Sequence, residues 1–312
     1  MNILLIAGGW SSERDVSLSG GQAIGAALEK LGHKVTRYDP EKNLNGLFDA
    51  ARGQDFAFIN LHGQPGEDGL PQAMLDTIGL PYQGSRPAGS FLALNKAVSK
   101  LIFRRLGLPT ADWELLTAHP GPDWKPSFDY PIFIKSNVGG SSLGLAKVRN
   151  AAELPPALDA LFAQGGEFIV EPMCPGADLT CGVLGEIADG LETPRALPPI
   201  LIKPKLHDGE FFDYESKYQN GGADEICPAP IDPEITAAAR EYALAAHQAL
   251  GLSGYSRTDF ILAPDGKLNV LEINTLPGMT PNSLIPKAAK AAGLSFEGVL
   301  RRLIELGMKA RP

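Results

Sequence analysis

The sequence is poor in cysteine and has no long apolar run. Its three cysteines (Cys174, Cys181 and Cys227) form neither a CxxC pair nor an even-numbered disulfide framework. No apolar run reaches the length of about 18 residues that a membrane helix needs. Residues 1–10 lack the basic start and the long apolar core of a signal peptide. We therefore expect a protein of the reducing cytoplasm that makes no membrane contact.

Positive charge is also scarce. Lys and Arg total 28 against 36 Asp and Glu, which leaves a formal net charge of −8. A protein whose main function is to bind the nucleic-acid backbone needs a clustered basic surface, so we expect no nucleic-acid partner. Glycine and proline, by contrast, are abundant, at 35 and 26 residues. No repeat accompanies them, which indicates many turns rather than a collagen-like or disordered chain.

The N-terminal part of the chain alternates short apolar runs with amphipathic stretches. The runs at 2–7, 34–38 and 56–60 are predicted strands, and helical spacing marks 17–31 and 72–78. This alternation predicts a parallel sheet covered by helices on both faces. At roughly 100–200 residues a domain, the length predicts two or three domains. We place the first, a parallel α/β domain, at residues 1–86.

Two further α/β units are predicted beyond it. One covers residues 87–177, with a helix at 91–106 and two strands between 130 and 148. The other covers 178–312. Within it, residues 206–229 show no periodicity, and so long a loop inside a compact domain is functional more often than accidental.

A hairpin is predicted where Asp265 and Gly266 separate two apolar runs, because Asp-Gly favours a two-residue turn. That turn pairs Asp259 with Glu272 and Arg257 with Asn274, all on one face. Directly opposed carboxylates repel each other and need compensation. Asp, Glu and Asn form the hard oxygen set that binds Mg²⁺ together with substrate phosphates. From these residues alone, a solvent-facing strand with scattered charges is an equal alternative.

Glycine-rich loops offer candidate anion sites. The loop 139–144 (GGSSLG) links two predicted strands just after Lys135, and its glycines let backbone N–H groups approach anionic oxygens. It is not a P-loop, since GxxxxGK[ST] is absent, and a hairpin loop without ligand remains the alternative. Gly8-Gly9 after the first strand lacks the GxGxxG spacing, which makes a dehydrogenase the weaker interpretation.

Six segments, taken in order, resemble the D-alanine–D-alanine ligase family, the ATP-grasp enzymes of bacterial cell-wall synthesis. They span nearly the whole chain and are specific in combination. The segments are GGWSSERDVSLSGG (8–21), LHGQPGEDGLPQAMLDTIGLPYQGS (61–85), KSNVGGSSLGLAKV (135–148), FFDYESKYQNGG (211–222), GYSRTDF (254–260) and NVLEINTLPGMTPNSLIPKAAKAAG (269–293).

The resemblance implies an α/β ATP-grasp fold with α+β elements. Its N-terminal domain would hold a parallel sheet, the central domain would be small, and the C-terminal domain would hold a mixed sheet, with a mobile loop at about 206–229 closing over the site. It implies a homodimer, ATP, and two Mg²⁺ ions that Mn²⁺ could replace. By motif position, the metal ligands are Asp259, Glu272 and Asn274. The residues implied in ATP binding are Lys96, Lys135, Glu171, Pro172, Cys174, Asp178 and Lys217.

The substrate-side residues are likewise implied by the resemblance. Glu13, Ser141 and Tyr218 would position the first D-alanine and the closing loop, and His62 would lie near that substrate's carboxylate. The oxyanion would be stabilised by Arg257 and the Gly278 N–H, and the second carboxylate would be held by Ser283 and Leu284. Three positions depart from the usual family residues: Asn95 stands for Asp, Ser136 for Pro, and Gly139 for an acidic residue.

The reaction implied is ATP-dependent joining of two D-alanines through an acyl phosphate, for peptidoglycan precursor synthesis. The first alternative keeps this chemistry but takes D-lactate, D-serine or another small acid or amine as the second substrate. The remote alternative is a nucleotide-binding regulator without catalysis.

Overall fold

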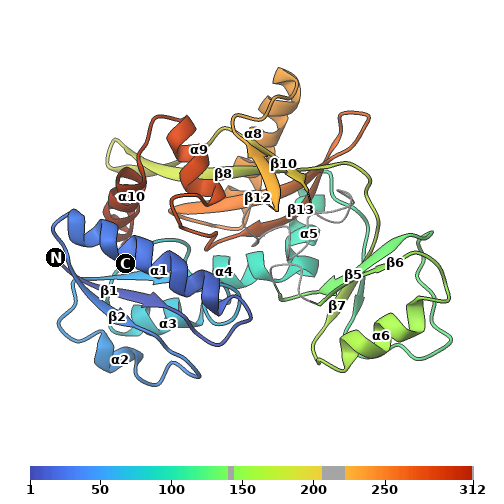
Figure 1. The fold of residues 1–312 in the computed structure, drawn as a ribbon, viewed down its shortest axis with the longest axis horizontal. Coiled ribbons are helices and arrows are strands. Elements are labelled where there is room, and N and C mark those ends of the chain that lie inside the picture. The colour runs from blue at the N-terminus through green and yellow to red at the C-terminus, as the bar shows by residue number, and fades with distance from the viewer. Residues whose placement is uncertain (140–143, 206–221, 311–312) are drawn as a thin grey trace.

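The computed structural model describes residues 1–139, 144–205 and 222–310. Three sheets organise the described residues (Figure 1), and they are formed by strands within residues 2–60, 114–172 and 177–274. The division into domains at 86 and 177 itself stays a prediction. Within the described ranges, no helix combines the length and the apolar character that a bilayer crossing requires.

The N-terminal sheet is parallel, as predicted. Its order is β2 (Lys34–Tyr38), β1 (Asn2–Ala7) and β3 (Phe56–Asn60). Helix α1 (Arg14–Lys30) lies close against these strands, because a Cβ on Gly21 would come within 2.6 Å of the Ala7 Cβ. The short helices α2 (Leu47–Ala50) and α3 (Leu70–Thr77) complete this part of the chain. The predicted helices at 17–31 and 72–78 are both present, each beginning two or three residues earlier.

A small antiparallel sheet forms the unit on the right of Figure 1. Its order is β4 (Glu114–Leu116), β7 (Phe168–Pro172), β5 (Ile132–Ser136) and β6 (Leu145–Val148). Helix α6 (Leu154–Phe162) packs on it through apolar residues that include Leu158 and Leu161. The two predicted strands on either side of the glycine-rich loop are β5 and β6.

Among the residues that the structure describes, the large sheet has six strands. Its order is β11 (Ala223–Ile226), β10 (Ile200–Pro204), β8 (Ala177–Ala188), β12 (Tyr255–Leu262) and β13 (Leu268–Asn274), with β9 (Leu191–Ala196) paired to β8. Every pairing among these strands is antiparallel, so the mixed sheet expected here is wrong in this detail. Part of 206–229 also differs from expectation, because residues 223–226 pair with β10 as β11 instead of forming loop.

Helices cover both faces of the large sheet. Helix α8 (Pro233–Ala249) shares one apolar core with β8, β12 and β13. Helices α9 (Leu284–Ala291) and α10 (Phe296–Lys309) share another with the N-terminal sheet. The large sheet is therefore joined to the N-terminal unit through a continuous core.

The single helix predicted at 91–106 is wrong, because two helices occupy this region. Helix α4 (Pro87–Leu94) ends and α5 (Lys96–Arg105) begins at Asn95, whose backbone is extended (φ −78°, ψ 100°). The Asn95 side chain caps α5 by accepting from the Val98 N–H at 3.1 Å. Both helices pack on the large sheet through Ala93 and Phe103. The break places Lys96 at the start of a helix rather than in the middle of one.

The β12–β13 hairpin has the predicted pairing at Arg257 and Asp259, but neither the predicted turn nor the predicted register beside it. Ala263 and Lys267 close a three-residue loop, since the Ala263 N–H donates to the Lys267 carbonyl at 2.8 Å. A β-bulge then follows Asp259, and Leu271 is the extra residue on β13. The two departures cancel, so Asp259 lies opposite Glu272 and Arg257 opposite Asn274.

Candidate active site

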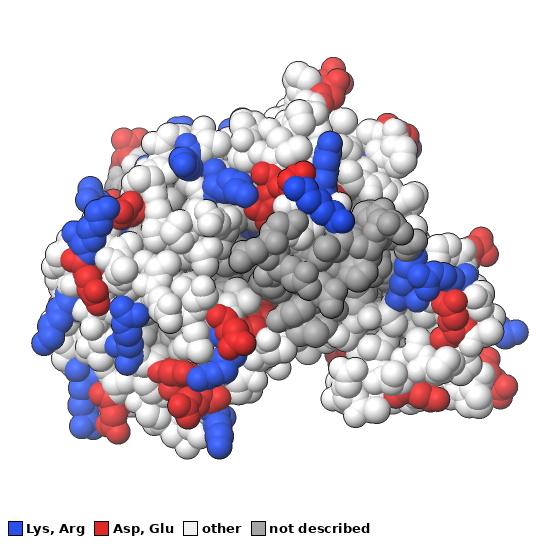
Figure 2. Space-filling view, in the orientation of Figure 1, with Lys and Arg blue, Asp and Glu red and all other residues white. Residues whose placement is uncertain are grey.

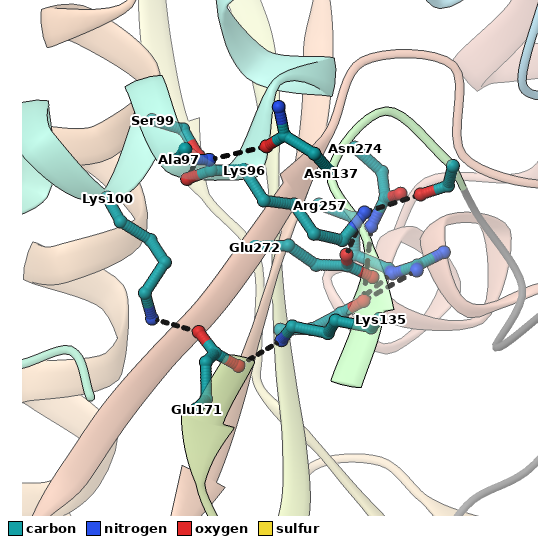
Figure 3. Close-up of polar contacts among 12 residues, drawn as sticks. Lys96, Ala97, Ser99, Lys100, Lys135, Asn137, Glu171, Arg257, Glu272 and Asn274 are labelled. Carbon is teal, nitrogen blue, oxygen red and sulfur yellow. Dashed lines mark hydrogen bonds and ion pairs between the residues drawn. The ribbon is translucent and has the colours of Figure 1, made fainter. Parts of the chain in front are cut away.

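The polar face of the hairpin forms one connected cluster (Figure 3). Arg257 donates to the Asp259 carboxylate from Nε at 2.8 Å and from Nη2 at 2.7 Å. The amide of Asn274 donates to the same carboxylate at 3.1 Å. Thr180 on β8 donates to it at 2.6 Å. Asp259 therefore accepts hydrogen bonds from three side chains, and Arg257 supplies its counter-charge.

Glu272, the other opposed carboxylate, is paired with Lys96. The Lys96 ammonium lies 3.1 Å from Glu272 Oε2, and it also donates to the Gly139 carbonyl. A cation at the first turn of a helix is unfavourable because the N–H dipoles there are positive. The carboxylate of Glu272 offsets that repulsion, so α5 and β13 compensate each other's charge.

Asn137 fixes the start of α5 and was not among the predicted residues. It is wholly buried just beyond β5. Its carbonyl and side-chain oxygen accept from the N–H groups of Lys96 and Ala97, each at 2.9 Å. Its own N–H and amide group donate to Glu167, also at 2.9 Å. Asn137 thus ties the glycine-rich loop to the helix that carries Lys96; only its position two residues after Lys135 could have drawn attention to it.

A second cluster is buried at the end of β7. The Glu171 carboxylate lies between two ammonium groups, at 2.6 Å from Lys100 and 2.5 Å from Lys135 (Figure 3). Burial would raise the pKa of Glu171, but the charges of Lys135 and Lys100 outweigh burial and lower it. Glu171 is therefore ionised. Lys100 was missed by the sequence analysis, although its spacing of four residues from Lys96 puts both on one helix face.

The segment after Glu171 connects the small sheet to the large one. Pro172 ends β7, and the Met173 N–H donates to the Pro131 carbonyl at 3.0 Å. Cys174 is half-buried, and burial raises the pKa of its thiol. Asp178 follows on β8, where its backbone pairs with Ile202 and Ile261.

Residues of the N-terminal unit supply a third group. Glu13 precedes α1, and His62 and Glu67 belong to the segment between β3 and α3; all three are buried. Burial, with the nearby Glu13 carboxylate, raises the pKa of Glu67 to about 8. The His62 Nδ1 lies 3.0 Å from the Leu276 carbonyl, and burial lowers the pKa of the ring. A neutral ring that donates from Nδ1 presents Nε2 as an acceptor, and this buried atom has no hydrogen-bond partner among the described residues.

The segment after β13 leads into α9. Ser283 is the residue before that helix, and its backbone is extended (φ −68°, ψ 159°). The Ser283 hydroxyl accepts from the Thr280 N–H at 3.0 Å, and a Cβ on Gly278 would approach it to 3.2 Å. Leu284 is the first residue of α9, where backbone N–H groups have no intrahelical acceptor.

Three predicted residues, Ser141, Lys217 and Tyr218, lie outside the described part of the chain. The three departures from family residues do have structural explanations. Asn95 caps α5, a role for which Asn and Asp are equivalent. Gly139 and Ser136 belong together, because a Cβ at 139 would lie 2.8 Å from the Ser136 hydroxyl oxygen.

Charge elsewhere on the visible face is mixed in sign. Figure 2 shows acidic and basic side chains interspersed there, without a continuous basic patch among its described residues. The paired carboxylates and lysines of the site are carried by the small antiparallel sheet, the large antiparallel sheet and helix α5. Such a fold and site define a class, the ATP-grasp ligases, whose solved structures this chain matches in fold.

Comparison with known proteins narrows the class. A family model described as D-ala D-ala ligase C-terminus matches residues 102–305. The D-alanine–D-alanine ligase of Oleidesulfovibrio alaskensis is 63% identical over 310 residues, covering 99% of this chain and 97% of the relative. That of Nitratidesulfovibrio vulgaris is 60% identical and covers 99% of each. The chain belongs to the D-alanine–D-alanine ligase family.

Solved structures agree with this assignment. The D-alanine–D-alanine ligase of Bacillus anthracis complexed with ATP is 33% identical, with a TM-score of 0.81 over 100% of this chain and 98% of its own. The VanG D-Ala:D-Ser ligase of Enterococcus faecalis is 27% identical, with a TM-score of 0.81 over 98% of each chain. The predicted family and fold class are confirmed.

Proposed function

We propose that this protein joins two D-alanine molecules to D-alanyl-D-alanine, at the expense of ATP and through an acyl phosphate. The observation that carries the proposal is the hairpin face. Asp259 and Glu272 lie opposite each other with Asn274 beside them, and Arg257 and Lys96 supply the counter-charge. Two carboxylates and two cations on one face would suit the point where a triphosphate and a substrate carboxylate meet.

The proposed metal ligands are Asp259, Glu272 and Asn274. Their oxygens fit Mg²⁺, which prefers carboxylates, carbonyls and phosphates. Within the described residues, no group of three or more His, Cys, Asp or Glu forms a protein-only metal site. A site with two carboxylates and one amide suits ions that also bind phosphate oxygens. Two Mg²⁺ ions, or Mn²⁺ in their place, would supply Lewis-acid charge to the phosphates when bound.

ATP would lie between the small and the large sheet. Lys96 and Lys135 would contact its phosphates, with Lys217 as a further contact. Glu171, the Pro172 carbonyl and the Cys174 N–H would meet the adenine edge, and Asp178 the ribose. The support for this placement is positional: apart from Lys217, which lies outside the described residues, these residues belong to β5, α5, the end of β7, the start of β8 and the segment between those two strands.

The two amino acids would lie between the hairpin face and the N-terminal unit. Glu13, with Ser141 and Tyr218, would orient the first D-alanine. His62 would stand beside its carboxylate and, with a lowered pKa in the free protein, would take up a proton on binding. The Ser283 hydroxyl and the Leu284 N–H would hold the second carboxylate at the start of α9.

The chemistry explains why these groups are needed. A carboxylate is a poor electrophile, so the first D-alanine must accept the γ-phosphoryl group before the amine of the second can attack. Phosphoryl transfer depends mainly on positioning and positive charge. Arg257 and the Gly278 N–H would stabilise the tetrahedral oxyanion. Water would hydrolyse the acyl phosphate, so a closing loop at 206–229 would protect it.

A second candidate changes only the second substrate. The likeness to the VanG D-Ala:D-Ser ligase favours testing D-serine beside D-lactate. Phosphate release with ATP and D-alanine alone, compared with D-alanine plus each competitor, separates the candidates, and mass spectrometry identifies the dipeptide. No phosphate release with D-alanine alone would contradict the main proposal. ATP binding without turnover on any of these substrates would instead favour a nucleotide-binding regulator.

The proposal extends to assembly and location. We expect a homodimer, as the family resemblance implies, and light scattering at several concentrations measures it. We also expect the enzyme to work in the cytoplasm, where ATP is supplied; fractionation of cells that produce the protein would test this.

A further inference from the structure

Lys100 is a buried lysine to which the proposed reaction assigns no role. It lies on α5 with 0% exposure, one helical turn beyond Lys96. Its ammonium is 2.6 Å from Glu171 Oε1 and 2.7 Å from Thr110 Oγ1. It also lies 5.5 Å from the centroid of the Trp113 ring. An ammonium group taken fully out of water is costly, so its surroundings must compensate it closely.

The partners of Lys100 hold it in one place. Thr110 donates its hydroxyl to the Val270 carbonyl at 2.8 Å, which turns the oxygen lone pairs toward the ammonium. Glu171 supplies the charged acceptor, and the Trp113 ring adds a cation–π contact. Lys100 is thus tethered from three directions and cannot leave Glu171 to reach a phosphate.

Lys135, the other partner of Glu171, differs in this respect. Its side chain is 17% exposed, against 0% for Lys100, and its ammonium points to Glu171 from the strand β5 (Figure 3). In the proposed function, Lys135 contacts the ATP phosphates. Glu171 then shares one of its two counter-charges with the nucleotide and depends on Lys100 for the other.

We propose that Lys100 is a positioning residue for base recognition. It holds the Glu171 carboxylate ionised and in one orientation, so that Glu171 accepts from the 6-amino group of adenine and disfavours a 6-oxo purine. This inference rests on the proposed placement of the adenine edge at Glu171.

The selectivity follows from hydrogen-bond chemistry. An ionised carboxylate only accepts, which matches an exocyclic amino group and repels an exocyclic oxygen. A protonated carboxyl group can also donate, and it would tolerate the oxygen. The charged groups that face Glu171 are Lys100 from α5 and Lys135 from β5, with the Cys174 thiol beyond the strand end. Loss of Lys100 removes one of the two cations that keep the carboxylate ionised.

The test compares ATP with ITP, which differs in carrying an oxygen at the 6-position. We expect Lys100→Met to lower the ATP/ITP ratio of kcat/KM about tenfold, the usual scale of one hydrogen bond to a charged group. The change should lie in the KM for ATP, while kcat and the KM for D-alanine stay within about twofold. Lys30→Met, at an exposed lysine on α1, is the matched control and should leave the ratio unchanged.

A second variant covers the case in which Lys100→Met fails to fold. Thr110→Val keeps the shape of the side chain but removes the hydroxyl that tethers Lys100, and we expect a smaller drop in the ratio, about threefold. Binding of ATP and ITP measured by calorimetry without D-alanine gives the same comparison without turnover. It therefore separates this inference from the ligase reaction itself.

The outcomes are distinct. An unchanged ATP/ITP ratio in both variants would overturn the role of Lys100, even if the wild type is an active ligase. Equal losses for ATP and ITP, accompanied by a lower Tm, would show a purely structural lysine and also overturn it. An inactive wild type whose ATP preference over ITP still depends on Lys100 would contradict the proposed reaction and support the inference.

Discussion

The two charged clusters of the site differ in burial and in charge balance. At the end of β7, two lysines surround one glutamate, whose side chain is 5% exposed. On the hairpin, Arg257 and Lys96 face Asp259 and Glu272, whose side chains are 20% and 22% exposed. In the first cluster Glu171 and Lys100 are removed from water, so the protein itself must balance their charge, and only Lys135, at 17% exposure, can reach a ligand. The second is open enough for incoming ions to exchange with the protein's own cations.

The comparison teaches that similar ion pairs serve different purposes. A pair removed from water is costly to break, because the remaining charge has nothing to replace its partner. A partly exposed pair is cheap to rearrange, since water, metal or phosphate can take the vacated place. The buried Lys100–Glu171 pair at the end of β7 is therefore suited to fixing geometry, and the hairpin cluster to exchanging its cations for ligands.

We expect the largest effect from a substitution that breaks the buried cluster at the end of β7. Glu171→Gln leaves Lys100 and Lys135 together without an anion, and we expect a loss of about 3–5 kcal/mol in stability. Differential scanning calorimetry would show it as a drop in Tm. The matched control is Glu234→Gln on the exposed first turn of α8, which should change Tm little. A Glu171→Gln variant as stable as the control would mean that the cluster is not the rigid element argued for.

The next effect concerns the open cluster. Glu272→Gln should lower the ligation rate on the order of 10²–10³-fold, because it removes a charged group from the reacting centre. Its effect on Tm should be small, since the site is partly exposed. The measurement is phosphate release over a range of Mg²⁺ concentrations. If the Glu272→Gln variant were as active as the wild type at low Mg²⁺, Glu272 would not be a metal ligand.

A third change tests the link between the clusters. Asn137→Ala removes a side chain that accepts from the Ala97 N–H and donates to Glu167. We expect a loss of about 1–3 kcal/mol, because buried polar groups are left without partners. The KM for ATP should rise as well, since Lys96 loses its fixed position. Asn45→Ala, at an exposed asparagine, is the control for both Tm and KM. If the two variants had equal Tm and equal KM for ATP, Asn137 would have no part in positioning Lys96.

The smallest effect is on the pH dependence of stability. Burial raises the pKa of Glu67 to about 8 in the folded protein, above the value of 4.5 for an unperturbed Glu. The folded state then binds more protons than the unfolded state, so this group makes stability fall as pH rises from about 4.5 to 8. Glu67→Gln should flatten that fall by at most about 1.4 kcal/mol per pH unit. The check is Tm at pH 5, 6, 7 and 8; parallel Tm curves for variant and wild type would refute it.

Local sequence predicted much of the fold, because strands and helices follow from residue periodicity. The parallel N-terminal sheet, the β5–β6 pair and the hairpin pairing of Arg257 and Asp259 were all predicted correctly. This pairing was correct although the turn was predicted one residue too short, because the extra residue Leu271 in the bulge restores the predicted partners of Asp259 and Arg257. Periodicity also failed at Asn95, where a side-chain cap ends one apolar pattern and starts another.

The sequence by itself determined the family, the hairpin pairing and the kinds of side chain brought to the site, since all of these are patterns along one chain. Only the tertiary structure decided which charges meet. Lys100 and Glu171 are 71 positions apart in the chain yet lie 2.6 Å apart, and Lys96 reaches Glu272 across two units of the fold. Contacts of this kind depend on how α5 packs between the two antiparallel sheets. No local pattern encodes that packing, because it is the sum of many small apolar contacts made by residues far apart in the sequence.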